Sequence, residues 1–214
     1  MTQRIVEAMT DAPAIVRNRR LDILVANPFG YALYAPLYPD PLHPDPSKPA
    51  NLARFCFLDP RASDLYPQWE VAADTSVALL RTEAGRDPFD RDLSDLVGEL
   101  STRSEPFRTR WARHDVRLHR TGTKAFHHPV VGDLELDFET IELSADDGLV
   151  LTAYSSAPER RRTTGSRYSR TGSPPNPGPA NGRISTTAER VAGMAVRRCR
   201  TQGAAAGPPE FAPG

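Results

Sequence analysis

The stretch GTKAFHHPVVGDLELDFETIEL, residues 122–143, decides the fold. Before it, apolar residues recur at helical spacings, whereas within it they alternate with polar residues, as in a strand with one buried face. Gly132 and Asp133 supply a tight turn that divides the stretch into two strands. We expect the first strand over 124–128 and the second through an alternating set, Leu134, Leu136, Phe138 and Ile141.

Further strands are predicted on either side of this hairpin. After a turn at 146–148, the period of two continues through Leu149, Leu151 and Ala153. Residues 14–26, AIVRNRRLDILVA, contain two short β-rich apolar runs around a polar turn and predict an N-terminal hairpin. Two strands, a block of helices and three antiparallel strands together predict an α+β fold: a five-stranded antiparallel sheet with helices packed on one face.

The block between the second and third strands has helical spacing. Asn27 before a proline and Asn51 before an apolar run are predicted N-caps. Longer helices are expected from Trp69 to Gly85, after Asp87-Pro88, and from Ser104 onward. Alternate prolines over 39–46 predict a surface loop.

The composition excludes several classes of protein. The chain has 214 residues, with 27 basic and 27 acidic side chains, and no apolar run long enough for a membrane helix or a signal peptide. We therefore expect a cytoplasmic protein with no membrane partner. Cys56 and Cys199 fit neither a disulfide framework nor a zinc finger. Nucleophile elbows and glycine-rich phosphate loops are absent from the sequence, so we expect neither an enzyme nor a bound cofactor.

The C-terminal part differs in composition from the rest. Residues 1–156 contain 17 basic and 24 acidic residues, whereas residues 157–214 contain 10 basic and 3 acidic residues, eight prolines and no leucine. A segment with so little apolar side-chain area cannot offset the conformational entropy lost on folding. The sequence predicts a folded domain ending near Ser156 and a disordered Arg/Pro/Gly-rich tail over 157–214.

Six collinear segments carry a resemblance to a known family: residues 17–27, 32–37, 51–55, 95–101, 107–116 and 128–132. With them, the chain from about Pro13 to Tyr154 resembles the ligand-binding domain of MmyB-like transcription regulators. In that family a PAS-like domain follows an XRE-type helix-turn-helix. The resemblance implies a PAS-like fold over 13–156 and a sensor that binds a small apolar ligand, for which a fatty acid is the suggested example.

Two parts of the chain depart from the family pattern. Residues 1–12 are interpreted as the remnant of an interdomain helix or linker, because they are too few for a helix-turn-helix. Sequence-specific DNA binding is therefore expected only through a helix-turn-helix that these residues cannot contain. The tail replaces the helix expected after the last strand. Its codons, reread one base upstream from Pro158, are compatible with an apolar helical segment, which suggests that the tail is out of frame.

Candidate ligand contacts follow from the helical part and the third strand: Arg54, Phe55, Trp69, Trp111, His114 and His128. The tryptophans lie on apolar helix faces and could either form a wall of a ligand pocket or pack in the core. A fatty-acid carboxylate needs a cation or a hydrogen-bond donor, which Arg54 or His114 could supply. His128 is interpreted either as a pocket residue or as a buried, hydrogen-bonded histidine, and we expect no metal site.

Two other functions compete with ligand sensing. A PAS-like sheet can serve as a dimerisation or interaction module with a filled core, which would make the chain a homodimer without a ligand. The chain could also be a truncated, non-functional fragment of a regulator. The Arg-rich tail could attract nucleic acid through phosphates without reading its sequence.

Overall fold

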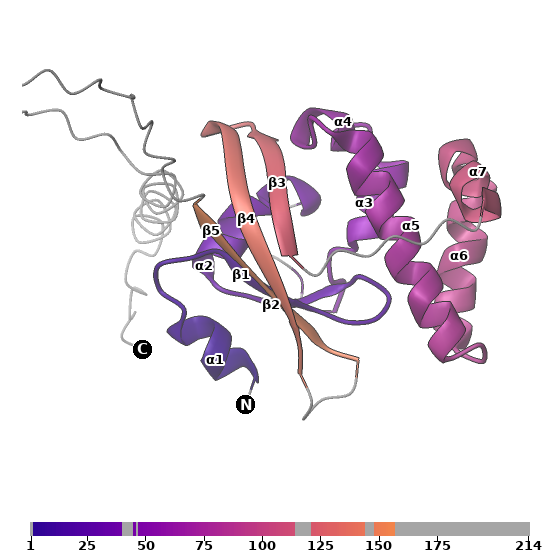
Figure 1. The fold of residues 1–214 in the computed structure, drawn as a ribbon, viewed down its shortest axis with the longest axis horizontal. Helices are drawn as coiled ribbons and strands as arrows, with labels where there is room; N and C mark the ends of the chain where they lie inside the picture. Colours follow the sequence, from indigo (N-terminus) through magenta and orange to yellow (C-terminus); the bar gives the residue numbers. More distant parts are fainter. Residues whose placement is uncertain (1, 40–44, 46, 114–120, 144–147, 157–214) are drawn as a thin grey trace, which may run out of the picture.

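The computed structural model describes residues 2–39, 45, 47–113, 121–143 and 148–156 (Figure 1). The predictions for the tail over 157–214 and for His114 lie outside the described residues, as does part of the predicted 146–148 turn.

A single five-stranded antiparallel sheet forms one half of the molecule (Figure 1). Its strands are β1 (Ala14–Arg17), β2 (Ile23–Ala26), β3 (Thr121–His128), β4 (Gly132–Glu142) and β5 (Val150–Ser156). The spatial order is β2-β1-β5-β4-β3, so the last strand lies between the two hairpins. The sheet and both predicted hairpins are confirmed. Gly132 begins β4 with a φ of 75°, a conformation that glycine adopts without strain.

Most helices follow β2 and precede β3, as expected. They are α2 (Pro28–Leu33), the short 3₁₀ helix η1 (Ala35–Leu37), α3 (Leu52–Leu58), α4 (Ala62–Leu65), α5 (Trp69–Arg86), α6 (Arg91–Arg103) and α7 (Glu105–Arg113). Helices α3, α5, α6 and α7 lie together beside the sheet (Figure 1). Helix α6 begins later than predicted, because Asp90 rather than Asp87 caps it by accepting a hydrogen bond from the Leu93 N–H. None of the helices in the described ranges has the length and apolar character needed to cross a bilayer.

Both predicted asparagine caps are confirmed, Asn27 before α2 and Asn51 before α3, and Asn27 also joins neighbouring elements. Asn27 is fully buried, and its Oδ1 accepts hydrogen bonds from the N–H groups of Gly30 and Ala14. Its Nδ2 donates to the carbonyls of Met9 and Ala12. All four bonds are 2.6–3.0 Å long, so this side chain joins the start of α2 to β1 and to the N-terminal segment.

Helix α2 approaches the sheet closely at Gly30. A Cβ atom at this position would lie 2.3 Å from the carbonyl oxygen of Ala14, closer than packed atoms can come. Only glycine therefore lets the backbone of α2 pack directly on β1.

The first helix differs from the expectation that helices cover only one face of the sheet. Helix α1 (Thr2–Ala8) packs on the opposite face, where Val6 is fully buried against Ala14, Val16 and Leu151. Successive side chains of a strand point to opposite faces of the sheet. Ile15 therefore packs in the core on one face, and Ala14 and Val16 pack in the core on the other. Residues 2–8 thus form part of this hydrophobic packing.

Candidate functional site

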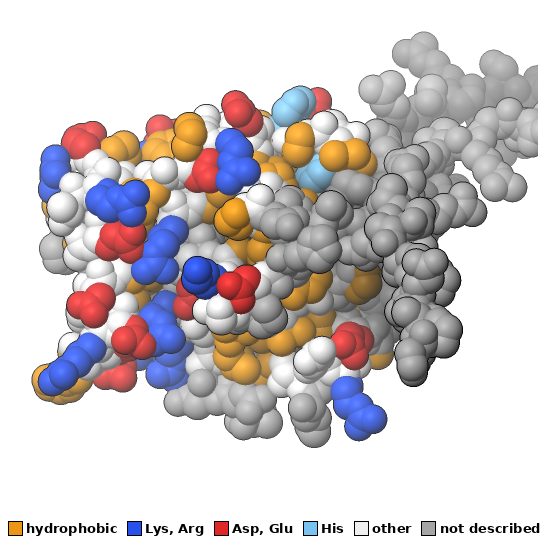
Figure 2. All heavy atoms as spheres, turned by 180° about the vertical axis from the view of Figure 1, so that it is seen from behind, with side chains coloured by type: hydrophobic (Ala, Val, Ile, Leu, Met, Phe, Trp, Pro, Cys, Tyr) orange, Lys and Arg blue, Asp and Glu red, His pale blue; other side chains and the backbone are white. Residues whose placement is uncertain are grey.

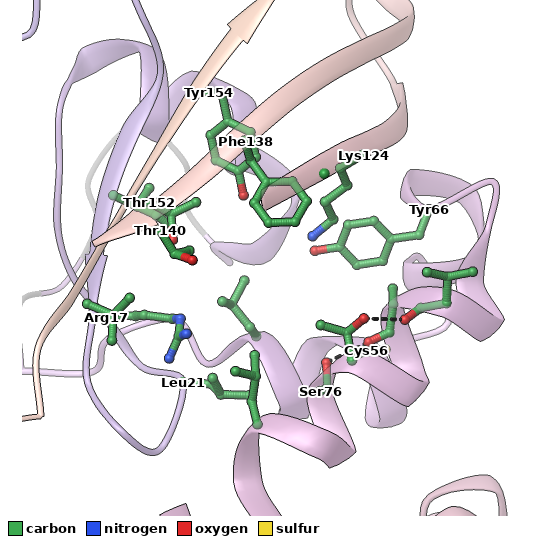
Figure 3. A pocket seen from close by; sticks show the side chains of 18 of the residues that line it. Arg17, Leu21, Cys56, Tyr66, Ser76, Lys124, Phe138, Thr140, Thr152 and Tyr154 are labelled. Carbon is green, nitrogen blue, oxygen red and sulfur yellow. Dashed lines mark hydrogen bonds between the residues drawn. The ribbon is translucent and has the colours of Figure 1, made fainter. Parts of the chain in front are cut away.

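A cavity of about 430 Å³ lies between the inner face of the sheet and helices α3 and α5 (Figure 3). Its volume falls within the range of small-molecule sites, roughly 300–1,000 Å³. The side of α5 that faces it carries mostly short or polar side chains: Ala72, Thr75, Ser76, Leu79, Thr82 and Glu83. Most of these side chains are short, which leaves space between the helix and the sheet, whereas Arg86 at the end of α5 reaches Glu142 on β4.

Strand register brings the residues of the opposite wall together. Thr152 of β5 is paired with Thr140 of β4 on one side and with Ile15 of β1 on the other, so all three face the cavity. Arg17, two residues beyond Ile15, has the same facing. Phe138 and Tyr154 form the next cross-strand pair on this wall.

Arg17 is a buried cation with few partners. Only 7% of the residue is exposed, and its guanidinium points into the cavity (Figure 3). Its one hydrogen bond within the described residues is a long one, 3.5 Å, to the carbonyl of Asn18. Burial lowers its pKa, against the weaker attraction of Glu83 and Glu142. Most of its five N–H donors are therefore left for an acceptor inside the cavity.

The two carboxylates near Arg17 are engaged by other guanidinium groups. Glu83 lies 3.4 Å from Nε of Arg19 and 3.1 Å from Nη1 of Arg86. Glu142 lies 3.5 Å from Nη2 of Arg86. Neither comes within ion-pair distance of Arg17 in the described residues, although both carboxylates line the same cavity and attract its guanidinium from a longer distance.

Lys124 supplies a second cation from β3. Its ammonium lies 4.5 Å from the ring centre of Tyr66, 5.1 Å from that of Phe126 and 5.8 Å from that of Tyr34. The described residues offer it these ring faces but no hydrogen bond or ion pair. Burial lowers its pKa to about 8, with a smaller contribution from the charge of Arg17. Lys124 thus also presents an unneutralised charge to the cavity.

Three tyrosines and a cysteine complete this end of the site. The hydroxyls of Tyr34 and Tyr154 are hydrogen-bonded to each other, and burial raises the pKa of both, that of Tyr154 to about 12. Burial likewise raises the pKa of Tyr66, and that of the Cys56 thiol to about 12. A thiol with that pKa is protonated at neutral pH, so Cys56 lines the cavity as a small apolar group, not as a nucleophile.

The candidates predicted on α3 and α5 lie outside the cavity lining. Arg54 is half exposed, and its Nε is 2.8 Å from Glu99 on α6. Phe55 is buried in the core, with its ring edge against Tyr66. Trp69 donates from Nε1 to the carbonyl of Cys56 and is covered by the guanidinium of Arg110. Figure 2 shows the helical side of the surface to be covered with interspersed acidic and basic side chains.

The remaining candidates are also separate from the cavity. Trp111 stacks on Phe107, and Arg81 lies over its ring. His128 is 1% exposed; its Nε2 is 3.1 Å from the carbonyl of Ala32, and its Nδ1 accepts from the N–H of Val130. Burial lowers its pKa, so it is a neutral histidine that connects β3 to α2.

The sequence interpretation did not select the residues that line the cavity. Arg17 directly follows the apolar residues 14–16 and ends the strand Ala14–Arg17 on the same side as Ile15. Lys124 stood in a predicted strand at the spacing of Phe126, the inward-facing position. It is also one of only two lysines beside 25 arginines. These charges at inward-facing strand positions were the available signal.

All residues that line the cavity lie within the range that matches a known protein family. Residues 1–165 match the family described as the MmyB-like transcription regulator ligand binding domain. The chain belongs to this family. A search of curated proteins finds no match.

The match gives the cavity a context. An MmyB-like domain is the ligand-binding part of a transcription regulator, and here the sheet, the helices and the cavity all lie within the matched residues. The match starts at residue 1 and so includes helix α1.

Proposed function

We propose that this MmyB-like domain is the sensor of an XRE-type, PAS-like regulator and that its ligand is a small apolar acid, of which a fatty acid is the simplest case. The ligand would occupy the cavity between the sheet and α5, with its apolar part against Leu79, Phe138 and Ile15. Its carboxylate would lie at Arg17. In such a regulator, DNA would be contacted by a helix-turn-helix, and occupancy of the cavity would be communicated to it.

The observation that carries this proposal is the burial of Arg17 beside an open cavity. Removing an unpaired charge from water costs several kcal/mol, and natural domains normally avoid this. A carboxylate can accept two parallel hydrogen bonds from one guanidinium, which makes it a suitable partner. The hydroxyl of Thr152 faces the same space and can donate to the same oxygens.

The experiment is a calorimetric titration with dodecanoate. It compares the wild type with two variants in which a phenylalanine is introduced. Ala72→Phe places a ring in the cavity from α5, whereas Thr102→Phe adds the same ring at an exposed position of α6. We expect saturable binding by the wild type and by Thr102→Phe, and at least a tenfold loss in Ala72→Phe.

Two outcomes would contradict the proposal. If fatty acids of eight to sixteen carbons all fail to bind the wild type, the cavity is not a site for apolar acids. If Ala72→Phe binds as well as the wild type and remains folded, the acid binds elsewhere. Native mass spectrometry of the same samples would then separate an empty dimer, as expected of an interaction module, from a monomer.

A further inference from the structure

Three cations line the cavity, and a fatty acid has a single anionic group. Arg86 is paired with Glu83 and Glu142, whereas Arg17 and Lys124, on different strands of the sheet, form no ion pair within the described residues. Arg17 is on β1, and Lys124 is on β3, with β5 and β4 between them in the sheet. Both side chains point inward, and their charged ends face each other across the open centre of the site (Figure 3). A carboxylate bound at Arg17 leaves the ammonium of Lys124 without an acceptor.

The surroundings of Lys124 do not neutralise it. The described side chains that interact electrostatically with its ammonium are the Cys56 thiol, from α3, and Arg17, from β1. The rings in contact with it belong to Tyr66, Tyr34 and Phe126. The two tyrosine hydroxyls and the thiol are all protonated at neutral pH. An aromatic face attracts an ammonium, but it stabilises the charge by less than the removal of water costs.

On the basis of the proposed function, we infer that the natural ligand carries two separated acceptor groups, as an α,ω-dicarboxylate does, one bound by Arg17 and the other by Lys124. The apolar stretch between Ile15, Phe138 and Leu79 accommodates the connecting chain. The two cations then recognise the two acceptor groups of the ligand. The apolar lining contributes to affinity but does not distinguish one end group from another.

This arrangement predicts an inversion of the usual preference of an apolar cavity. A site with one cation rejects a dicarboxylate, because the second carboxylate is buried without a partner. A site with two cations rejects the monocarboxylate instead, because one cation stays unpaired. The sign of the preference therefore distinguishes one recognition point from two.

The test is calorimetric titration at pH 7 with pairs of acids of equal length, from four to fourteen carbons, each pair being a dicarboxylate and its monocarboxylate. The proteins are the wild type, Lys124→Met and the control Arg54→Met, whose guanidinium is paired with Glu99 at the surface. In the wild type and the control, we expect the dicarboxylate to bind at least tenfold more tightly at the length that spans the two cations. In Lys124→Met the preference should disappear while binding of the monocarboxylate persists.

A second readout reports the proton on Lys124 itself. At pH 8.5, close to the pKa of about 8, dicarboxylate binding should take up a fraction of a proton in the wild type. The uptake is measured by repeating the titration in buffers of different ionisation enthalpy. Lys124→Met should show none of it.

The outcomes separate this inference from the proposed function. If the monocarboxylate binds at least as tightly as its dicarboxylate at every length, the domain still senses an apolar acid, but the second recognition point is refuted. The same conclusion follows if Lys124→Met keeps the preference. If neither series binds the wild type, the proposed function fails, and this inference fails with it.

Discussion

The two sides of helix α5 make opposite use of buried space. Towards α3, α6 and α7, it packs Val77 and Leu80 into an apolar core with Leu96, Leu100 and Phe107. Towards the sheet, it leaves a cavity of about 430 Å³ into which the charged ends of Arg17 and Lys124 point. Apolar packing on the first side stabilises the fold. On the second side, charged side chains are removed from bulk water, which lowers the stability of the protein when no ligand is bound. The cavity is therefore held by a scaffold that is stabilised elsewhere in the domain.

The largest effect on stability is expected from the apolar core between α5 and helices α3, α6 and α7. Leu100 is fully buried in the helical core, so Leu100→Ala removes apolar contacts and leaves a void. We expect a loss of about 2–5 kcal/mol in the free energy of unfolding, measured by urea denaturation. Affinity for dodecanoate, measured where the variant is folded, should stay unchanged. A large change in affinity would mean that the two sides are not independent.

Asn27 provides a buried polar group whose hydrogen bonds are all made, in contrast to Arg17. Asn27→Ala leaves two N–H groups and two carbonyls near α2 without their partner. We expect a loss of about 3 kcal/mol in thermal or urea unfolding. Asn27→Asp keeps the acceptor but places a carboxylate against the carbonyls of Met9 and Ala12, so it should also destabilise. A neutral Asn27→Asp would show that those two bonds are not needed.

Lys124 should make the ligand-free protein more stable as the pH rises from 8 to 9. Its pKa is about 8 in the folded protein and near 10.5 when exposed, so over this interval the unfolded chain binds more protons and stability increases with pH. Cys56, with its pKa raised to about 12, acts in the opposite direction above pH 8, because the unfolded thiol loses its proton first. The difference between wild type and Lys124→Met isolates the lysine, and we expect it to change by about 1 kcal/mol. Parallel pH profiles of the two proteins would refute this assignment.

The smallest effect is expected for a cation that is paired at the surface. Arg54 is half exposed and bound to Glu99, so Arg54→Met should change the free energy of unfolding by no more than about 0.5 kcal/mol. Dodecanoate affinity should equal that of the wild type. A loss of affinity would return Arg54 to the list of ligand contacts that the sequence had suggested.

Much of the fold could be predicted because it depends on local patterns. The alternation in Leu134, Leu136 and Phe138 predicted one strand. Asn27 before a proline and Asn51 before an apolar run predicted two helix starts. The site could not be predicted in this way. Its wall depends on β5 inserting between β1 and β4, which places Thr152 beside Thr140 and brings Arg17 to the same face.

The described candidate residues do not line the cavity, and there is a physical reason for this. Aromatic residues on helix faces were selected, yet Trp69 and Trp111 are covered by Arg110 and Arg81 and pack with neighbouring rings. A large side chain can fill the space in front of it, and on α5 the cavity lies where the side chains are short. Ala72 and Ser76 on α5 are such positions, and their sequence signal is weak.

The most direct test of the central claim compares the thermal stability of wild type and Arg17→Met, each with and without saturating dodecanoate. Without ligand, we expect Arg17→Met to be at least as stable as the wild type, because a buried, poorly paired charge is replaced by an apolar side chain. With dodecanoate, the wild type should gain stability by mass action and become the more stable protein, while the variant gains little. If Arg17→Met is the less stable protein without ligand and dodecanoate stabilises both equally, Arg17 is a structural residue and not the anchor for a ligand.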